Sequence, residues 1–115
     1  MAQTALYYHP DFLEHEASPG HPERPERLIS LMGELERSGL LGQLGVREPA
    51  TAQVQSLTRI HSPEHVAHLS RLSGLGRMVS LGPDTSLSPA TYRAACLAVG
   101  AAEEAIEAVV AGGGQ

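Results

Sequence analysis

Residues 21–28 read His-Pro-Glu-Arg-Pro-Glu-Arg-Leu and place one histidine, two prolines, two glutamates and two arginines in succession. Each proline restricts its own backbone and that of the residue before it, so the stretch predicts a stiff charged loop. Pro25 suits the first position of a helix and Gly39 the residue after its end. Between them, apolar residues recur at spacings of three and four, as on one helical face: Leu28, Leu31, Met32 and Leu35. The sequence therefore predicts a loop that runs directly into an amphipathic helix.

The composition describes an acidic chain of 115 residues that is poor in aromatic side chains. Apolar residues make up 42% but aromatic residues only 3%, so the core must be built from small side chains that bury little area each. The net charge is −5, which argues against a nucleic-acid-binding surface, because such a surface needs a basic patch. The first residues lack the basic and apolar regions of a secretory signal, so we expect none, and no apolar run reaches the length of a membrane span. The single cysteine, Cys96, predicts a small buried side chain. We expect a cytoplasmic protein with neither a nucleic acid nor a membrane as its partner.

The first half of the chain predicts two short strands, over residues 4–8 and 45–49, on either side of the amphipathic helix. The segment over residues 9–24 predicts a long loop, and loops of that length often carry function. A strand, a helix and a second strand in this order are typical of a parallel sheet.

The second half predicts mainly helices. Thr51 is a suitable N-cap for a helix that carries Val54, Leu57 and Ile60, and Ser62 suits the cap of the next one. Both helices are expected to be two to three turns long.

A loop is predicted over residues 73–87, which are rich in glycine. Ser88 is expected to cap a long helix of small apolar residues that ends near Ala111. The glycine-rich residues 112–115 are expected to lead into a further element.

This order of elements predicts an α/β fold of which only the opening part is present. A parallel sheet must be covered by helices on both faces, and here the predicted helices outnumber the strands. We expect that most of the sheet is missing and that the chain is marginally stable when it folds alone.

Three histidines, His61, His65 and His68, have a spacing that would bring imidazoles to one face of a continuous helix, and imidazole is a ligand for zinc. However, a helix capped at Ser62 leaves His61 outside it. A solvent-facing or packed histidine cluster is the favoured interpretation, and a small helical metal-binding protein is the alternative.

A second group of titratable residues lies in the charged loop, where His15 and His21 stand among Glu14, Glu16 and Glu23. These side chains have the chemistry to bind a divalent cation, but a loop positions ligands poorly without a rigid support. The favoured interpretation is that His21, Glu23 and the neighbouring arginines fix the loop through hydrogen bonds and ion pairs.

Asp84 follows a proline in the sequence Gly-Pro-Asp-Thr of residues 82–85. Aspartate in this position most often bonds to its own backbone in a turn. Its carboxylate is also able to accept hydrogen bonds from the amide groups of a ligand. Local chemistry alone favours the turn.

Taken together, these motifs resemble the N-terminal portion of the histone deacetylase superfamily, and most closely its bacterial deacetylase-like amidohydrolases and acetoin-utilisation proteins. The similarity extends over nearly the whole chain. It is carried by His9, Pro19 to Leu28, Gly39-Leu40, Ile60-His61-Ser62, Pro83-Asp84-Thr85, Ser88, Ala94-Ala95 and Gly100-Ala101.

The resemblance implies a zinc-dependent amidohydrolase of the arginase/deacetylase type, with a parallel sheet wrapped by helices. Such an enzyme removes acyl groups from amines such as acetyl-lysine, in a protein substrate, or acetylpolyamine. Within it, Arg27 would lie beneath the active site beside an interior channel, with His21 and Glu23 as supporting residues. Asp84 would bind the substrate backbone at the rim, so the resemblance favours a ligand-binding role for Asp84 over a turn alone.

The zinc ligands and paired histidines that the family implies are expected to follow this stretch, and His61, His65 and His68 do not match them. We therefore expect residues 1–115 to be the N-terminal fragment of one deacetylase domain, without a catalytic residue or a metal ligand of its own and inactive alone, whereas the full-length enzyme would use zinc. A non-catalytic binding or regulatory module derived from the same family is the alternative.

Overall fold

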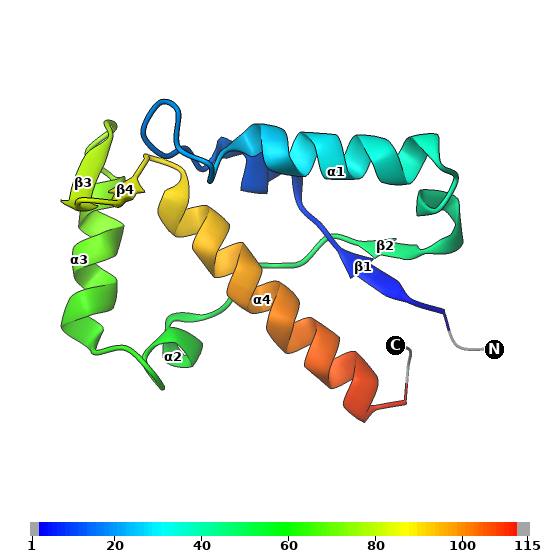
Figure 1. Ribbon diagram of the computed structural model, residues 1–115. Helices are drawn as coiled ribbons and strands as arrows, with labels where there is room; N and C mark the ends of the chain where they lie inside the picture. Colours follow the sequence, from blue (N-terminus) through cyan, green and yellow to red (C-terminus); the bar gives the residue numbers. More distant parts are fainter. Residues whose placement is uncertain (1–2, 113–115) are drawn as a thin grey trace.

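The computed structural model describes residues 3–112, and it consists of two small sheets and four α-helices. Of the glycine-rich tail that was predicted to lead onward, residues 113–115 lie outside the described residues. Figure 1 shows α1 lying across one side of the molecule, while α4 runs diagonally past it towards the C-terminus.

The two strands predicted in the first half are present and parallel. Strand β1 (Ala5–Tyr7) pairs with β2 (Gly45–Arg47), with Leu6 opposite Val46. They are joined through the 3₁₀ helix η1 (Pro10–Glu14), the loop over residues 15–24, helix α1 (Pro25–Arg37) and the 3₁₀ helix η2 (Leu41–Gln43). The loop over residues 15–24 is called the charged loop from here on. The predicted parallel pairing is therefore confirmed, and part of the predicted loop over residues 9–24 is a 3₁₀ helix instead.

Helix α1 begins at Pro25 as predicted. It ends because Gly39, two residues past its last residue, adopts a positive φ of 83°, which is unfavourable for residues with a side chain. Its predicted apolar face is partly covered: Leu28 is half-buried, whereas Leu31 remains 52% exposed.

Helix α3 (Pro63–Ser73) also begins as predicted, and the Ser62 hydroxyl accepts a hydrogen bond from the backbone N–H of His65. The prediction for the preceding helix was wrong. Helix α2 (Val54–Leu57) is a single turn capped by Gln53, not Thr51. It ends at Thr58, whose backbone N–H and hydroxyl both bond to the Val54 carbonyl. Ile60 therefore lies outside the helix and is 85% exposed.

The loop predicted over residues 73–87 was also wrong, because this segment forms a hairpin. Strand β3 (Val79–Gly82) pairs antiparallel with β4 (Thr85–Leu87), with Pro83 and Asp84 between them as the turn. The strands are too short for alternation to be visible in the sequence. The hairpin is held in place by Leu87, which is buried to 1% exposure.

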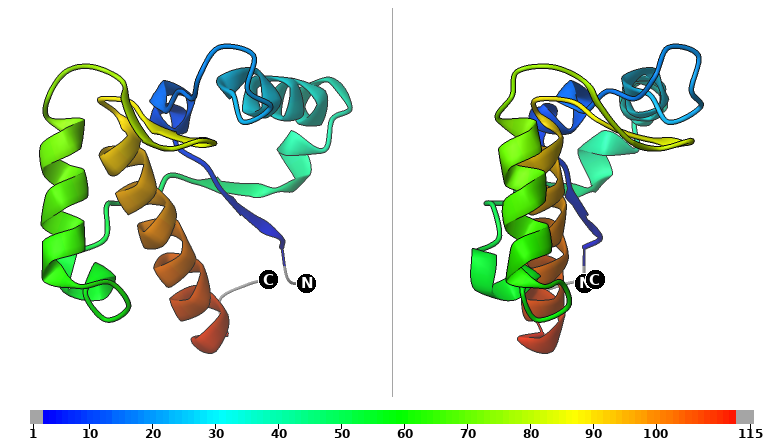
Figure 2. Two further views of the ribbon diagram at one scale, coloured as in Figure 1. Left: turned by 60° about the vertical axis from the view of Figure 1, so that its left-hand side comes forward. Right: turned by 90° about the vertical axis from the view of Figure 1, so that its left-hand side faces the viewer.

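Helix α4 (Thr91–Val110) begins later than predicted, with Ala90 rather than Ser88 at its cap position. Ser88 instead contacts Thr91 through its hydroxyl. Helix α4 lies alongside α3 and also contacts η1 and β1, as both views of Figure 2 show for α3. It is the central element that joins the two halves of the chain.

The core is small and lies where α3, β4 and α4 meet. Among the described residues, the buried apolar side chains are Val66, Leu87, Ala94, Cys96 and Leu97, which confirms Cys96 as a small buried residue. The radius of gyration is 15.9 Å, against about 13 Å for a compact chain of this length. The fold class is α/β as predicted, but the arrangement is open.

The far end of α4 contributes to this openness. Ile106, Val109 and Val110 are 63%, 59% and 81% exposed. None of the helices within residues 3–112 combines the length and the apolar character needed to cross a membrane.

Candidate functional site

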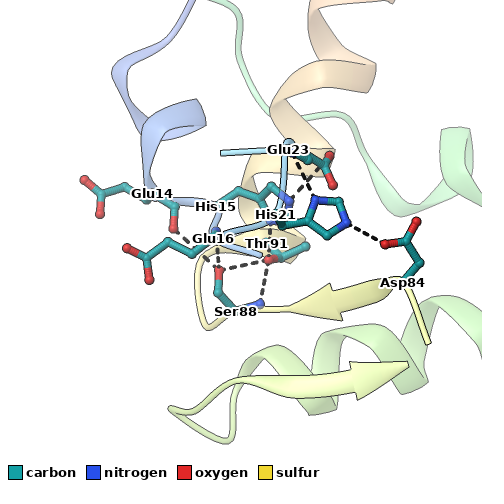
Figure 3. Close-up of polar contacts among 8 residues, drawn as sticks. All are labelled: Glu14, His15, Glu16, His21, Glu23, Asp84, Ser88 and Thr91. Atoms are coloured by element: carbon teal, nitrogen blue, oxygen red, sulfur yellow. Dashed lines mark hydrogen bonds and ion pairs between the residues drawn. The ribbon is translucent and has the colours of Figure 1, made fainter. Parts of the chain in front are cut away.

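The charged loop reaches the β3–β4 hairpin through His21 and Asp84. The Nε2 atom of His21 lies 2.8 Å from Oδ1 of Asp84. The carboxylate stands at the hairpin turn with 89% of its side chain exposed, whereas the imidazole is 19% exposed. Figure 3 shows this contact as a bridge from the loop to the turn. Asp84 lies in a turn, as local chemistry predicted, but its carboxylate bonds to His21 of the charged loop instead of to the backbone of its own turn.

The same loop makes three further contacts, one with β4, one with the turn after β4 and one with the first residue of α4. All four contacts together are here called the loop–hairpin seam, and Figure 3 shows three of them. Along the loop the partners occur in reverse order, so the two segments run antiparallel. The pairs are His15 with Thr91 (2.7 Å), Glu16 with Ser88 (3.1 Å), Ser18 with Ser86 (3.1 Å) and His21 with Asp84 (2.8 Å).

A buried serine supports the seam from below. The Ser73 hydroxyl donates to the Pro89 carbonyl at 3.0 Å and accepts from the Tyr92 N–H at 3.2 Å. This fixes the turn between β4 and α4. No buried side-chain nitrogen or oxygen in the described part of the chain lacks a hydrogen-bond partner.

Arg27 is not one of the seam residues, but it lies on the wall of an open cavity of about 340 Å³ that the seam residues His15 and Thr91 also line. The cavity is bounded by η1, α1 and α4, and its lining also includes Phe12, His15, Glu23 and Thr91. The Glu23 carboxylate lies 3.7 Å from Nε2 of His15. The predicted residues thus divide into two groups: His21 and Asp84 lie in the seam, while Arg27 and Glu23 line the cavity.

The arginines of the loop do not behave as predicted. The Arg–carboxylate ion pairs among the described residues are formed by Arg37 with Glu34 and Arg93 with Asp11, and not by Arg24 or Arg27. Histidines therefore fix the loop, and Arg24 and Arg27 are among the residues that line the cavity.

The ion pair of Asp11 with Arg93 ties η1 to α4 beside this cavity, with 2.7 Å between Nε and Oδ2. The hydrogen bond from Arg93 holds the pKa of the Asp11 carboxyl below its usual value. The pair is solvent-exposed, so it fixes geometry more than it adds stability.

The three histidines at and before α3, His61, His65 and His68, are not part of the seam and do not form a set of metal ligands. His65 and His68 are on the helix and His61 precedes it, and all three are exposed. Within residues 3–112, no three histidine, cysteine, aspartate or glutamate side chains converge as a metal site would require. The described residues therefore do not fit a zinc ion.

Sequence reasoning named His21 and Asp84 but missed their contact, and it missed the roles of Ser18, Ser86 and Thr91. Small hydroxyl residues are common in loops, so their presence was no signal. The antiparallel order of the seam is recognisable only in the folded chain, where residues 15–21 lie beside residues 84–91.

Known proteins share both the sequence pattern and the fold of this chain. A family model described as the histone deacetylase domain matches residues 21–115, which include both sides of the His21–Asp84 contact. The crystal structure of the HDA15 HD domain superimposes with a TM-score of 0.80 at 28% identity, over 88% of this chain and 30% of that one.

Similar proteins named as deacetylases indicate the same family. The chain is 33% identical to a probable deacetylase of Archaeoglobus fulgidus, over 93% of this chain and 30% of the relative. It is 36% identical to a histone deacetylase-like amidohydrolase of Pseudomonas aeruginosa, over 84% and 25%. The human polyamine deacetylase HDAC10 is 31% identical over 95% and 18%. The chain thus spans less than a third of each of these relatives, and it belongs to the histone deacetylase family.

Proposed function

We propose that residues 1–115 form the N-terminal part of a single deacetylase domain that hydrolyses N-acyl amides such as acetyl-lysine or acetylpolyamine. In this proposal the chain supplies part of the rim of the active site, where substrate binds, and part of its floor. The residues that cleave the amide lie outside residues 1–115. A cytoplasmic location is part of the same proposal.

The open faces of the fold support a larger domain. Val46 on β2 is 48% exposed and Val110 at the end of α4 is 81% exposed, although strands of a parallel sheet are ordinarily covered on both faces. Burying such surface is the main favourable contribution to folding. We infer that further strands and helices of a deacetylase domain pack on these faces.

The observation that carries the proposed role in substrate binding is the carboxylate of Asp84. It is almost fully exposed, at a hairpin turn, and it is held by one hydrogen bond. A carboxylate has about four acceptor positions, so most of its capacity remains for the amide N–H groups of a substrate. The position matches the rim aspartate that the family resemblance implies.

Arg27 is proposed to lie in the floor of the active site. It lines the cavity between α1 and α4 together with apolar side chains, and a guanidinium group favours small carboxylate anions. This fits a passage for the acid released on hydrolysis, with Glu23 and His15 beside it. Because the described residues do not fit zinc, no step of the reaction is assigned to a metal held here.

The first prediction concerns the chain alone. Purified residues 1–115 are expected to show no turnover of an acetyl-lysine peptide and no tight zinc binding, because no ligand set converges among the described residues. A fluorogenic deacetylase assay and zinc calorimetry measure both quantities. Turnover that is abolished by a chelator would contradict the proposal.

The second prediction concerns Asp84 in a complete domain, made by replacing the matching segment of the Pseudomonas aeruginosa relative with this chain. Asp84→Ala is expected to raise KM for an acetyl-lysine peptide about 10- to 100-fold, the loss expected for hydrogen bonds to a charged group. Glu36→Gln removes an exposed charge elsewhere and serves as the control. Equal KM values for the two variants would refute the role of Asp84, and an inactive chimera that retains its zinc would favour the non-catalytic module.

A further inference from the structure

We propose that His21 is a positioning residue that holds the carboxylate of Asp84 in its substrate-binding orientation. This inference rests on the proposed function, because it concerns how the same rim carboxylate is held. It assigns to His21 of the charged loop a role that does not require a metal.

The ring of His21 is oriented by the backbone of its own loop. The N–H of Glu23 donates to Nδ1 of His21 at 3.0 Å, so Nδ1 must present a lone pair. In a neutral imidazole the proton is then on Nε2. Nε2 is the atom that lies 2.8 Å from the Asp84 carboxylate. One tautomer of the neutral ring therefore satisfies both hydrogen bonds, with no competing arrangement.

The loop that carries His21 is itself anchored at several points. The loop–hairpin seam fixes its backbone through Glu16 and Ser88 and fixes the neighbouring side chains through His15 and Ser18. Gly20 turns the chain with a φ of 79° immediately before His21, which residues with a side chain rarely adopt. The imidazole is thus presented from a rigid support, and its side chain is 19% exposed.

Asp84 has no comparable support of its own. It stands in a two-residue turn, its side chain is 89% exposed, and His21 is its hydrogen-bond partner among the described side chains. A free aspartate in such a turn samples several rotamers, and ordering it on binding costs affinity. A hydrogen bond from a fixed donor removes part of that cost before the substrate arrives. It uses one acceptor position and leaves the others open.

The variant His21→Asn separates the effects of the two hydrogen bonds that the ring makes. The Oδ1 atom of asparagine takes the place of Nδ1 and accepts the Glu23 N–H in the same manner as an Asx-turn, but the side chain is too short to reach Asp84. In the chimeric deacetylase, His21→Asn is expected to raise KM about tenfold, the size expected for one hydrogen bond to a charged group. The kcat is expected to change less than about twofold, because the reacting atoms are untouched. His68→Asn, an exposed histidine on α3, is the matched control.

A double-variant cycle distinguishes this inference from the proposed function. His21→Asn combined with Asp84→Ala is expected to have the same KM as Asp84→Ala alone, because there is no carboxylate left to position. If Asp84→Ala raises KM and His21→Asn does not, His21 has no positioning role and the proposed function stands. If neither variant alters KM, the proposed function itself fails.

The tautomer is tested in the 115-residue chain without any substrate. The ¹⁵N spectrum of the neutral imidazole rings is expected to show His21 protonated on Nε2 alone, whereas exposed His68 shows an average of both tautomers. His21→Asn identifies the signal by its loss. Protonation of His21 on Nδ1, or an average like that of His68, would overturn the inference.

Discussion

Replacing Gly100 by alanine is expected to destabilise the fold by about 3 kcal/mol, the upper end of the cost of overpacking a tight interior. Gly100 is buried on α4, where the linker between β2 and α2 crosses the helix. A Cβ atom at this position would lie 1.8 Å from the carbonyl oxygen of Ala50 and 3.2 Å from the backbone nitrogen of Ala52. Ala52 also donates its N–H to the Cys96 carbonyl at 3.0 Å. The clash is with backbone, so no side chain is able to relieve it by rotating.

The matched control is Gly33→Ala on α1, where nothing lies within 4 Å of the added atom. Alanine is the better helix former, so this variant is expected to gain about 0.5–1 kcal/mol. Urea unfolding followed by circular dichroism at the helix band measures both changes. The two substitutions are chemically identical and have opposite expected signs. A Gly100→Ala protein as stable as Gly33→Ala would show that the linker does not contact α4 this closely in solution.

Leu97→Ala is expected to cost about 3 kcal/mol of unfolding free energy, within the range measured for leucine truncation in protein cores. Leu97 is 1% exposed and lies in the small core where α3, β4 and α4 meet. Truncation of Leu97 leaves a cavity. Because the core contains few large side chains, few neighbouring groups are able to move into that cavity and fill it. We expect the urea midpoint to fall sharply and the hairpin amides to exchange with solvent faster.

Ile106→Ala on the same helix is the control, since its side chain is 63% exposed and its truncation is expected to change stability by less than about 0.5 kcal/mol. Comparable losses from Leu97→Ala and Ile106→Ala would mean that the far end of α4 is covered in solution. That result would contradict the burial pattern on which the Leu97 prediction depends.

Elements with strong local signals could be predicted from the sequence. Pro25 and Gly39 mark the limits of α1, and Ser62 with Pro63 marks the beginning of α3, because caps and proline positions act within a few residues. The hairpin could not be predicted, since β3 and β4 have four and three residues and Leu87 is buried in the small core where α3, β4 and α4 meet. Ser88 was misread as a cap because its hydroxyl bonds across to the loop.

The candidate site shows the same division. The charged loop and Asp84 were identified through a family resemblance, but the distance between His21 and Asp84 was not predictable from either segment. Each has a plausible local partner, and the sequence alone favoured a turn for Asp84. The seam depends on α4 and the hairpin being placed together by Ser73 and Leu87. The local sequence around His21 and Asp84 does not indicate how α4 and the hairpin are placed.

The antiparallel order of the seam also has a consequence for biosynthesis. Its contacts join residues 63 to 76 positions apart, and the ribosome delivers a chain from its N-terminus at about 5–20 residues per second. The charged loop must therefore leave the ribosome long before Thr91 exists. Its histidines and serines stay hydrated through that interval, because closing so long a segment has an entropic cost that only the finished contacts offset. The loop–hairpin seam is therefore assembled late in synthesis, after α1 and the β1–β2 pair have had time to form.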